Sequence, residues 1–87
     1  MQIFLVERDL TGISLADLTG TKAAAIRQAQ QMDDEGDRVR YLGSTFVPED
    51  GRCLCLFEAK SADIVRQLNY AARLPFERIV PVLELQP

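Results

Sequence analysis

The only two cysteines of the chain, Cys53 and Cys55, stand one residue apart in the stretch RCLCLFEA at 52–59. Thiolates bind metals and act as nucleophiles, so this pair is the first candidate for chemistry. The stretch has the composition of a β-strand, on which residues i and i+2 share a face about 6.6 Å apart along the chain. That spacing predicts that the two thiols do not close around one metal through ~2.3 Å bonds without distorting the strand. It also predicts that a disulfide between them would be strained.

Three interpretations of the cysteine pair remain open. In the first, both residues pack as small polarisable side chains in one face of a sheet. In the second, a two-fold axis brings Cys53 or Cys55 of two subunits together. In the third, the thiols line a small-molecule pocket between the sheet and its covering layer.

Glu7 and Arg8 end the first apolar stretch, in LVER. They are either an ion-paired or solvated strand end, or Glu7 points inward near Cys55 as a carboxylate with a raised pKa. In that second case Glu7 is a base or a metal ligand. Tyr41 and Thr45 are expected to share one face of a later strand and, with Arg8, are candidates for a ligand cleft. Tyr41 also suits an interface, because its ring is apolar and its hydroxyl polar.

Composition excludes several classes of function. The chain has no histidine, which removes histidine-activated nucleophiles and the commonest neutral metal ligand. Its net charge of -3 offers no basic stripe for nucleic acid. It contains neither a leader-like segment nor an apolar run near the ~18 residues of a membrane span. Two closely spaced cysteines are no disulfide framework, which indicates a reducing cytoplasm.

Hydrophobic patterning predicts six elements. They are a strand over 2–8, a helix over 15–35, strands over 38–47 and 52–58, a helix over 61–74 and a strand over 78–85. Ser14 and Ser61 are expected N-caps, whereas Gly20 and Thr21 predict a weak point at which the first helix restarts. Pro81 has no amide donor, so the last strand is expected at a sheet edge.

The order βαββαβ predicts a single domain over 1–87 with an α+β, ferredoxin-like fold, in which both helices cover one face of a four-stranded antiparallel sheet. Apolar residues point to both faces of the predicted strands, yet helices cover only one. A bare apolar sheet face is typical of an interface, so we expect a homodimer through the open faces. A monomer with an exposed sheet is the alternative.

Three stretches, LVERDL at 5–10, VRYLGSTFVPEDGRCLCLFEA at 39–59 and LPFERIVPVLEL at 74–85, resemble a family of small bacterial domains. The family is found largely in actinobacteria, has no characterised function and is often labelled nickel-binding protein. The resemblance implies a dimeric ferredoxin-like fold and nickel as the candidate metal. Without histidine, nickel would be held by Cys53, Cys55, carboxylates such as Glu7 or Glu58, or backbone groups. Position 43 is glycine, where the resemblance implies a longer polar side chain.

Three functions from different classes follow. The first is a small cytoplasmic binding protein for a metal ion or small molecule. The second is a cofactor-independent enzyme, of the monooxygenase, isomerase or cyclase kind, which rests on fold analogy alone. The third is a regulatory or assembly module without a ligand. We expect no nucleic-acid or membrane partner.

Overall fold

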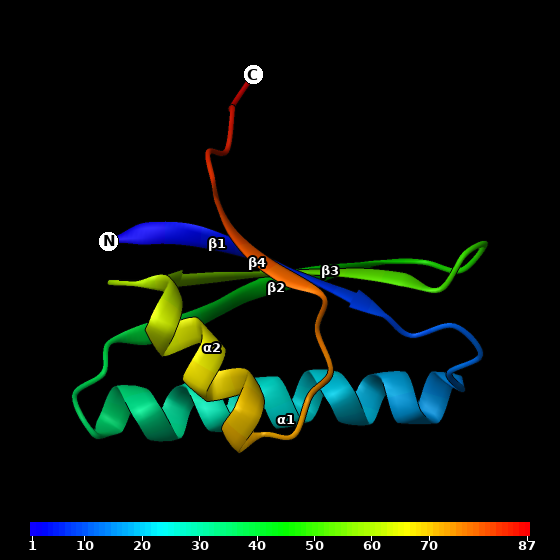
Figure 1. Cartoon of the computed structure of the whole chain (residues 1–87), viewed down its shortest axis with the longest axis horizontal. Coiled ribbons are helices and arrows are strands. Elements are labelled where there is room, and N and C mark those ends of the chain that lie inside the picture. The colour runs from blue at the N-terminus through cyan, green and yellow to red at the C-terminus, as the bar shows by residue number, and fades with distance from the viewer.

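The computed structural model describes residues 1–87 and contains the six predicted elements in the predicted order (Figure 1). They are β1 (Gln2–Asp9), α1 (Leu15–Asp34), β2 (Val39–Val47), β3 (Arg52–Ala59), α2 (Ala62–Ala71) and β4 (Arg78–Val82). The strands form one antiparallel sheet in the order β2-β3-β1-β4. Both helices lie on the same side of it (Figure 1). The ferredoxin-like prediction is confirmed.

The helix boundaries follow local signals in the sequence. The hydroxyls of Ser14 and Ser61 accept hydrogen bonds from backbone N–H groups three residues further on, as N-caps do. The weak point expected in α1 is absent, because the helix runs unbroken through Gly20. The Thr21 hydroxyl donates to the Asp17 carbonyl one turn earlier, at 3.0 Å. It therefore supports the same helix and does not cap a new one.

The helix-facing side of the sheet carries the core. Burial alternates strictly along β1 and β3, which is the pattern of strands covered on one face. Fourteen buried hydrophobic residues form one cluster: Phe4, Val6, Leu10, Ala25, Ala29, Met32, Val39, Cys53, Cys55, Phe57, Ala59, Val65, Leu68 and Leu74. Arg8 continues the same alternation and is also fully buried. A charged side chain therefore lies among the residues of the core.

A β-bulge changes the faces of β2. Tyr41 lies opposite Phe57 and Gly43 lies opposite Leu56, so Leu42 is an extra residue between them. Gly43 has a φ of +154°, which L side chains rarely adopt. The bulge shifts the alternation of every residue that follows it in the strand.

The predicted common face of Tyr41 and Thr45 is wrong because of this bulge. Tyr41 packs edge-on against Phe57, with ring centroids 5.6 Å apart, on the helix-facing side. Thr45 lies opposite Leu54, on the open face. Ser44 takes the place expected for Thr45, since it lies opposite Cys55.

The open face of the sheet is apolar and only half-buried in the single chain. Its side chains come from all four strands and include Ile3, Leu5, Val47, Leu54, Leu56, Val80 and Val82. β4 is an edge strand, as Pro81 predicted, but it ends at Val82. The residues after it rise from the sheet on the side away from the helices (Figure 1). Neither helix combines the length and apolarity that a bilayer crossing requires.

Candidate functional site

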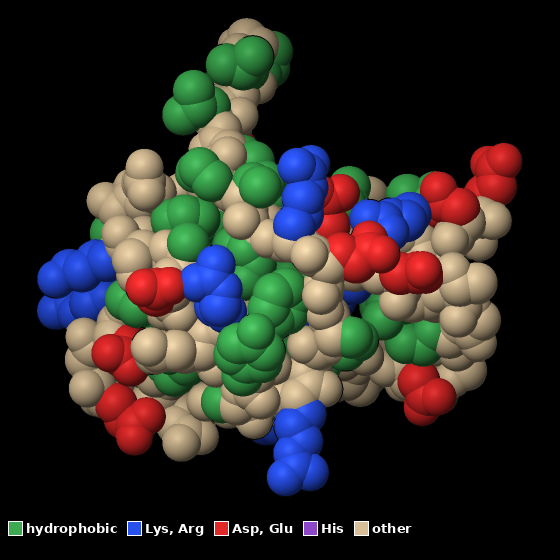
Figure 2. Space-filling view, in the orientation of Figure 1, with side chains coloured by type: hydrophobic (Ala, Val, Ile, Leu, Met, Phe, Trp, Pro, Cys, Tyr) green, Lys and Arg blue, Asp and Glu red, His purple; other side chains and the backbone are tan.

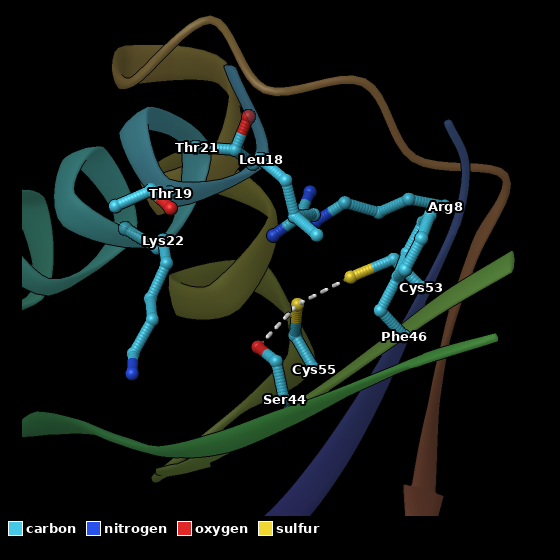
Figure 3. A pocket seen from close by; sticks show the side chains of 10 residues that line it. Arg8, Leu18, Thr19, Thr21, Lys22, Ser44, Phe46, Cys53 and Cys55 are labelled. Atoms are coloured by element: carbon cyan, nitrogen blue, oxygen red, sulfur yellow. Dashed lines mark hydrogen bonds between the residues drawn. The ribbon is translucent and has the colours of Figure 1, made fainter. Parts of the chain in front are cut away.

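A cavity of about 190 Å³ lies between α1 and the helix-facing side of the sheet (Figure 3). It is lined by Arg8 from β1, by Leu18, Thr19, Thr21, Lys22 and Ala25 from α1, by Ser44 and Phe46 from β2, and by Cys53 and Cys55 from β3. Pockets for drug-sized ligands are typically about 300–1,000 Å³. This cavity therefore suits a ligand of a few heavy atoms better than a large substrate.

The two cysteine sulfurs lie side by side on the wall of this cavity (Figure 3). Both residues are buried free thiols, and their Sγ atoms are 3.8 Å apart. The expectation that strand spacing keeps the thiols too far apart for one metal is wrong. Spacing along a strand describes the backbone, whereas the two side chains lean toward each other.

Ser44 adds a polar group to the cysteine pair. Its hydroxyl donates a hydrogen bond to Cys55 Sγ at 3.0 Å and shares a hydrogen bond of 2.6 Å with the Tyr41 hydroxyl. Burial raises the pKa of Tyr41, and the hydrogen bond with Ser44 opposes that rise. A polar chain thus runs from Tyr41 through Ser44 and Cys55 to Cys53. Ser44 is not among the residues predicted from the sequence. The signal for it is Gly43, because glycine inside a strand often marks a bulge.

The thiol of Cys53 is held in its protonated form at neutral pH. Burial, followed by the neighbouring Cys55, raises the pKa of Cys53 to about 11, against the opposing charge of Arg8. Because the thiolate is the nucleophile and the metal ligand, a thiol of this kind reacts slowly on its own. A ligand that replaces its proton must bind strongly enough to displace it.

Arg8 extends from β1 across the cavity toward α1 (Figure 3). Its side chain is fully buried, and Nη1 donates to the Pro75 carbonyl at 2.9 Å. Nε and Nη2 have no hydrogen-bond partner. Arg8 takes part in none of the salt bridges of the protein.

Glu7 lies on the other face of the sheet from the cysteines. It is opposite Leu54, whereas Cys55 is opposite Val6, so the predicted approach of Glu7 to Cys55 is wrong. Strict alternation along β1 and β3 separates them. Glu7 instead pairs with Arg78 and with Arg52, which makes it the ion-paired strand end of the alternative interpretation. Its hydrogen bond with Arg78 is the main reason that the pKa of Glu7 is lowered.

The cysteine pair is a two-donor cluster. Nowhere in the protein do three or more Cys, Asp or Glu side chains gather closely enough to hold a metal ion. Glu7 and Thr45, which were predicted to join the site, lie on the open face of the sheet. Arg8, the third residue of the predicted cleft, does line the cavity.

Comparison with known proteins gives the family of this chain. A family model described as nickel responsive protein SCO4226-like matches residues 4–82. The chain belongs to the SCO4226-like family. This membership confirms the resemblance found in the sequence.

A solved member of the SCO4226-like family has the same fold. The crystal structure of SCO4226 from Streptomyces coelicolor A3(2) is similar to this chain with a TM-score of 0.80 and 21% sequence identity. The similarity covers 97% of this chain and 99% of that chain. Among curated proteins, a search finds no match.

Proposed function

We propose that this protein is a small cytoplasmic binding protein that takes up one thiophilic divalent metal ion, nickel in the first instance, through Cys53 and Cys55. The observation that carries the proposal is the Sγ–Sγ distance of 3.8 Å. Two metal–sulfur bonds of ~2.3 Å at a tetrahedral angle place their sulfurs about 3.8 Å apart. Nickel is the first choice because the family is described as nickel responsive.

Two neighbouring groups interact favourably with negative charge on the sulfurs, although burial keeps the Cys53 thiol protonated in the metal-free protein. Arg8 lowers the pKa of Cys53, and the Ser44 hydroxyl donates to Cys55 Sγ, a bond that strengthens when the acceptor is charged. Two thiolates neutralise a divalent ion. Because they are only two donors, solvent or a small molecule in the cavity would complete the coordination. A protein that holds nickel in this way would sense or sequester the ion.

The metal proposal is tested on protein treated with a chelator and then dialysed. We expect one nickel ion per chain by elemental analysis, and a thiolate-to-nickel absorption band on titration with Ni²⁺. Cys53→Ser and Cys55→Ser should each abolish the band. Glu7→Gln is the matched control, since Glu7 lies on the other face of the sheet, and should leave it in place. Nickel no higher than a buffer blank would overturn the proposal.

The cytoplasmic part of the proposal rests on the cysteine usage of the chain. Two cysteines one residue apart form no disulfide framework, and such frameworks are typical of small proteins from oxidising compartments. Neither is positioned to form a disulfide with a residue elsewhere in the chain, because the chain has no other cysteine.

We further propose that the open sheet face packs against a second copy of the chain. Seven apolar side chains on that face are only half-buried, and a contiguous apolar patch is typical of an interface. Leu83 and Leu85 are 90% and 91% exposed on the segment that follows β4, and hydrophobic side chains of that segment stand clear of the body (Figure 2). A two-fold partner would cover both the face and the segment. Sedimentation at micromolar concentration should give twice the chain mass of 9.8 kDa; a monomer would contradict the proposal.

A further inference from the structure

Arg8 is a buried charge whose surroundings leave it unneutralised. Its side chain is fully buried, and no carboxylate forms a salt bridge with it. Two of the three buried side-chain polar atoms without a partner in the whole protein, Nε and Nη2, belong to this one residue. Burying a charged group is costly unless it is paired and hydrogen-bonded. The position therefore favours an anion as its partner.

The two unpartnered nitrogens define the shape of that anion. Nε–H and Nη2–H lie on one edge of the planar guanidinium and point in parallel, which matches the two oxygens of a carboxylate. Nη1, on the other side, is fixed by the Pro75 carbonyl at 2.9 Å. That bond orients the group, so the free edge is already positioned before any ligand binds.

Part of the cavity wall is apolar, because Leu18, Ala25 and Phe46 line it together with the two cysteines. The hydroxyls of Thr19, Thr21 and Ser44 also line the cavity, but each already donates its hydrogen bond, to the Leu15 carbonyl, the Asp17 carbonyl and Cys55 Sγ respectively. The lysine of the lining, Lys22, is exposed. A tetrahedral oxyanion such as phosphate would turn its remaining oxygens toward apolar side chains and toward hydroxyls that donate elsewhere, which is unfavourable. A carboxylate with a short apolar tail would satisfy the guanidinium edge and place the tail on the wall.

We propose that Arg8 anchors a binding site for a small organic monocarboxylate in this cavity. The site does not depend on a metal at the cysteines, because its charge and its hydrogen-bond donors come from Arg8 alone. The volume of about 190 Å³ limits the ligand to a few heavy atoms. Arg8 and the apolar wall together make the cavity selective for carboxylates over inorganic anions, and the cysteines do not provide this selectivity.

The test follows the Arg8 Nε–Hε resonance by ¹H–¹⁵N NMR in buffer that contains a chelator, so that metal binding has no influence on the result. Sodium acetate, butyrate, phosphate and chloride are titrated at matched ionic strength. We expect a saturable shift of the Arg8 resonance with both carboxylates. Butyrate should bind on the order of tenfold more tightly than acetate, since two more methylenes contact the apolar wall.

Arg8→Lys keeps the charge and loses the two-donor edge, so it should weaken butyrate binding at least roughly tenfold. Because this variant lacks the Arg8 resonance, its binding and that of the wild type are compared through the backbone amide resonances of the cavity residues Cys53 and Cys55. Arg40→Lys, at an exposed arginine of β2, is the matched control and should bind as the wild type does. If Arg8→Lys does not fold, the wild-type Arg8 resonance decides alone. No saturable shift with any carboxylate overturns the proposal. Phosphate or chloride binding as tightly as butyrate, or acetate binding as tightly as butyrate, overturns the ligand class.

Discussion

Arg8 lies directly opposite Cys53 in the β1–β3 pair, on the side of the sheet that faces the helices. The guanidinium lowers the pKa of the thiol, although burial and Cys55 outweigh it. The Arg8 guanidinium and the Cys53 thiol therefore both line the cavity.

The reactivity of Cys53 should follow its raised pKa. With a pKa of about 11, roughly one thiol in a thousand is ionised at pH 8. Carbamidomethylation of Cys53 by iodoacetamide, followed by peptide mass spectrometry, should therefore be far slower than in the unfolded chain. Its rate should keep rising as the pH approaches 11. Arg8→Met should slow it further at any given pH, because the positive charge that lowers the pKa is gone; an unchanged rate would contradict this relationship.

Glu7 should contribute to stability above acidic pH and lose that contribution in acid. Arg78, followed by Arg52, lowers the pKa of Glu7 from its ordinary value of 4.5. The sign follows from linkage: the stabilisation is present above the unfolded-state pKa and disappears as the pH falls through the folded-state pKa. Urea unfolding should therefore show Glu7→Gln less stable than the wild type at pH 7. The two should converge below pH 3; a constant difference across this range would contradict the ion-pair explanation.

Gly43 should resist substitution for reasons of backbone conformation alone. A Cβ built there meets no atom within 4 Å, yet the residue has a φ of +154°. Gly43→Ala should therefore destabilise the protein by about 1 kcal/mol or more in urea unfolding. Gly20→Ala is the matched control inside α1, where a Cβ also meets nothing within 4 Å. It should stabilise by about 0.5–1 kcal/mol, because alanine is the better helix former.

The proposed dimer predicts that a leucine-to-glutamate substitution changes the oligomeric state on the open sheet face but not on α1. Leu56→Glu places a charge on the open face of the sheet and should convert the dimer to a monomer in sedimentation. Leu15→Glu makes the same change at a leucine of α1 that is 78% exposed, and it should leave the oligomeric state unchanged. If the two variants have the same oligomeric state, the open face of the sheet is not the dimer interface.

Signals that act over a few residues were sufficient for the architecture. Ser14 and Ser61 mark helix starts, and Pro81 marks an edge strand, each through a local property of its own backbone or side chain. The order of elements followed from apolar periodicity. These features can be predicted from the sequence because they depend on residues that are neighbours along the chain.

The site was less predictable because it depends on side-chain directions across elements. The sulfurs of Cys53 and Cys55 approach to 3.8 Å through their side-chain conformations, which backbone spacing does not specify. Strict alternation places Glu7 on the other face of the sheet from the cysteines, which the predicted cluster had overlooked. The full burial of Arg8 depends on α1 covering it, a contact between distant parts of the chain.

The bulge in β2 has a further consequence for relatives of different length. Leu42 is the residue without a partner of its own, between Tyr41 and Gly43. A chain that lacks it would pair regularly, and every side chain before and after it would keep its face. The loss of one residue is therefore tolerable at this point of the strand. Elsewhere in β2, a deletion of one residue would move the side chains that line the cavity to the other face of the sheet.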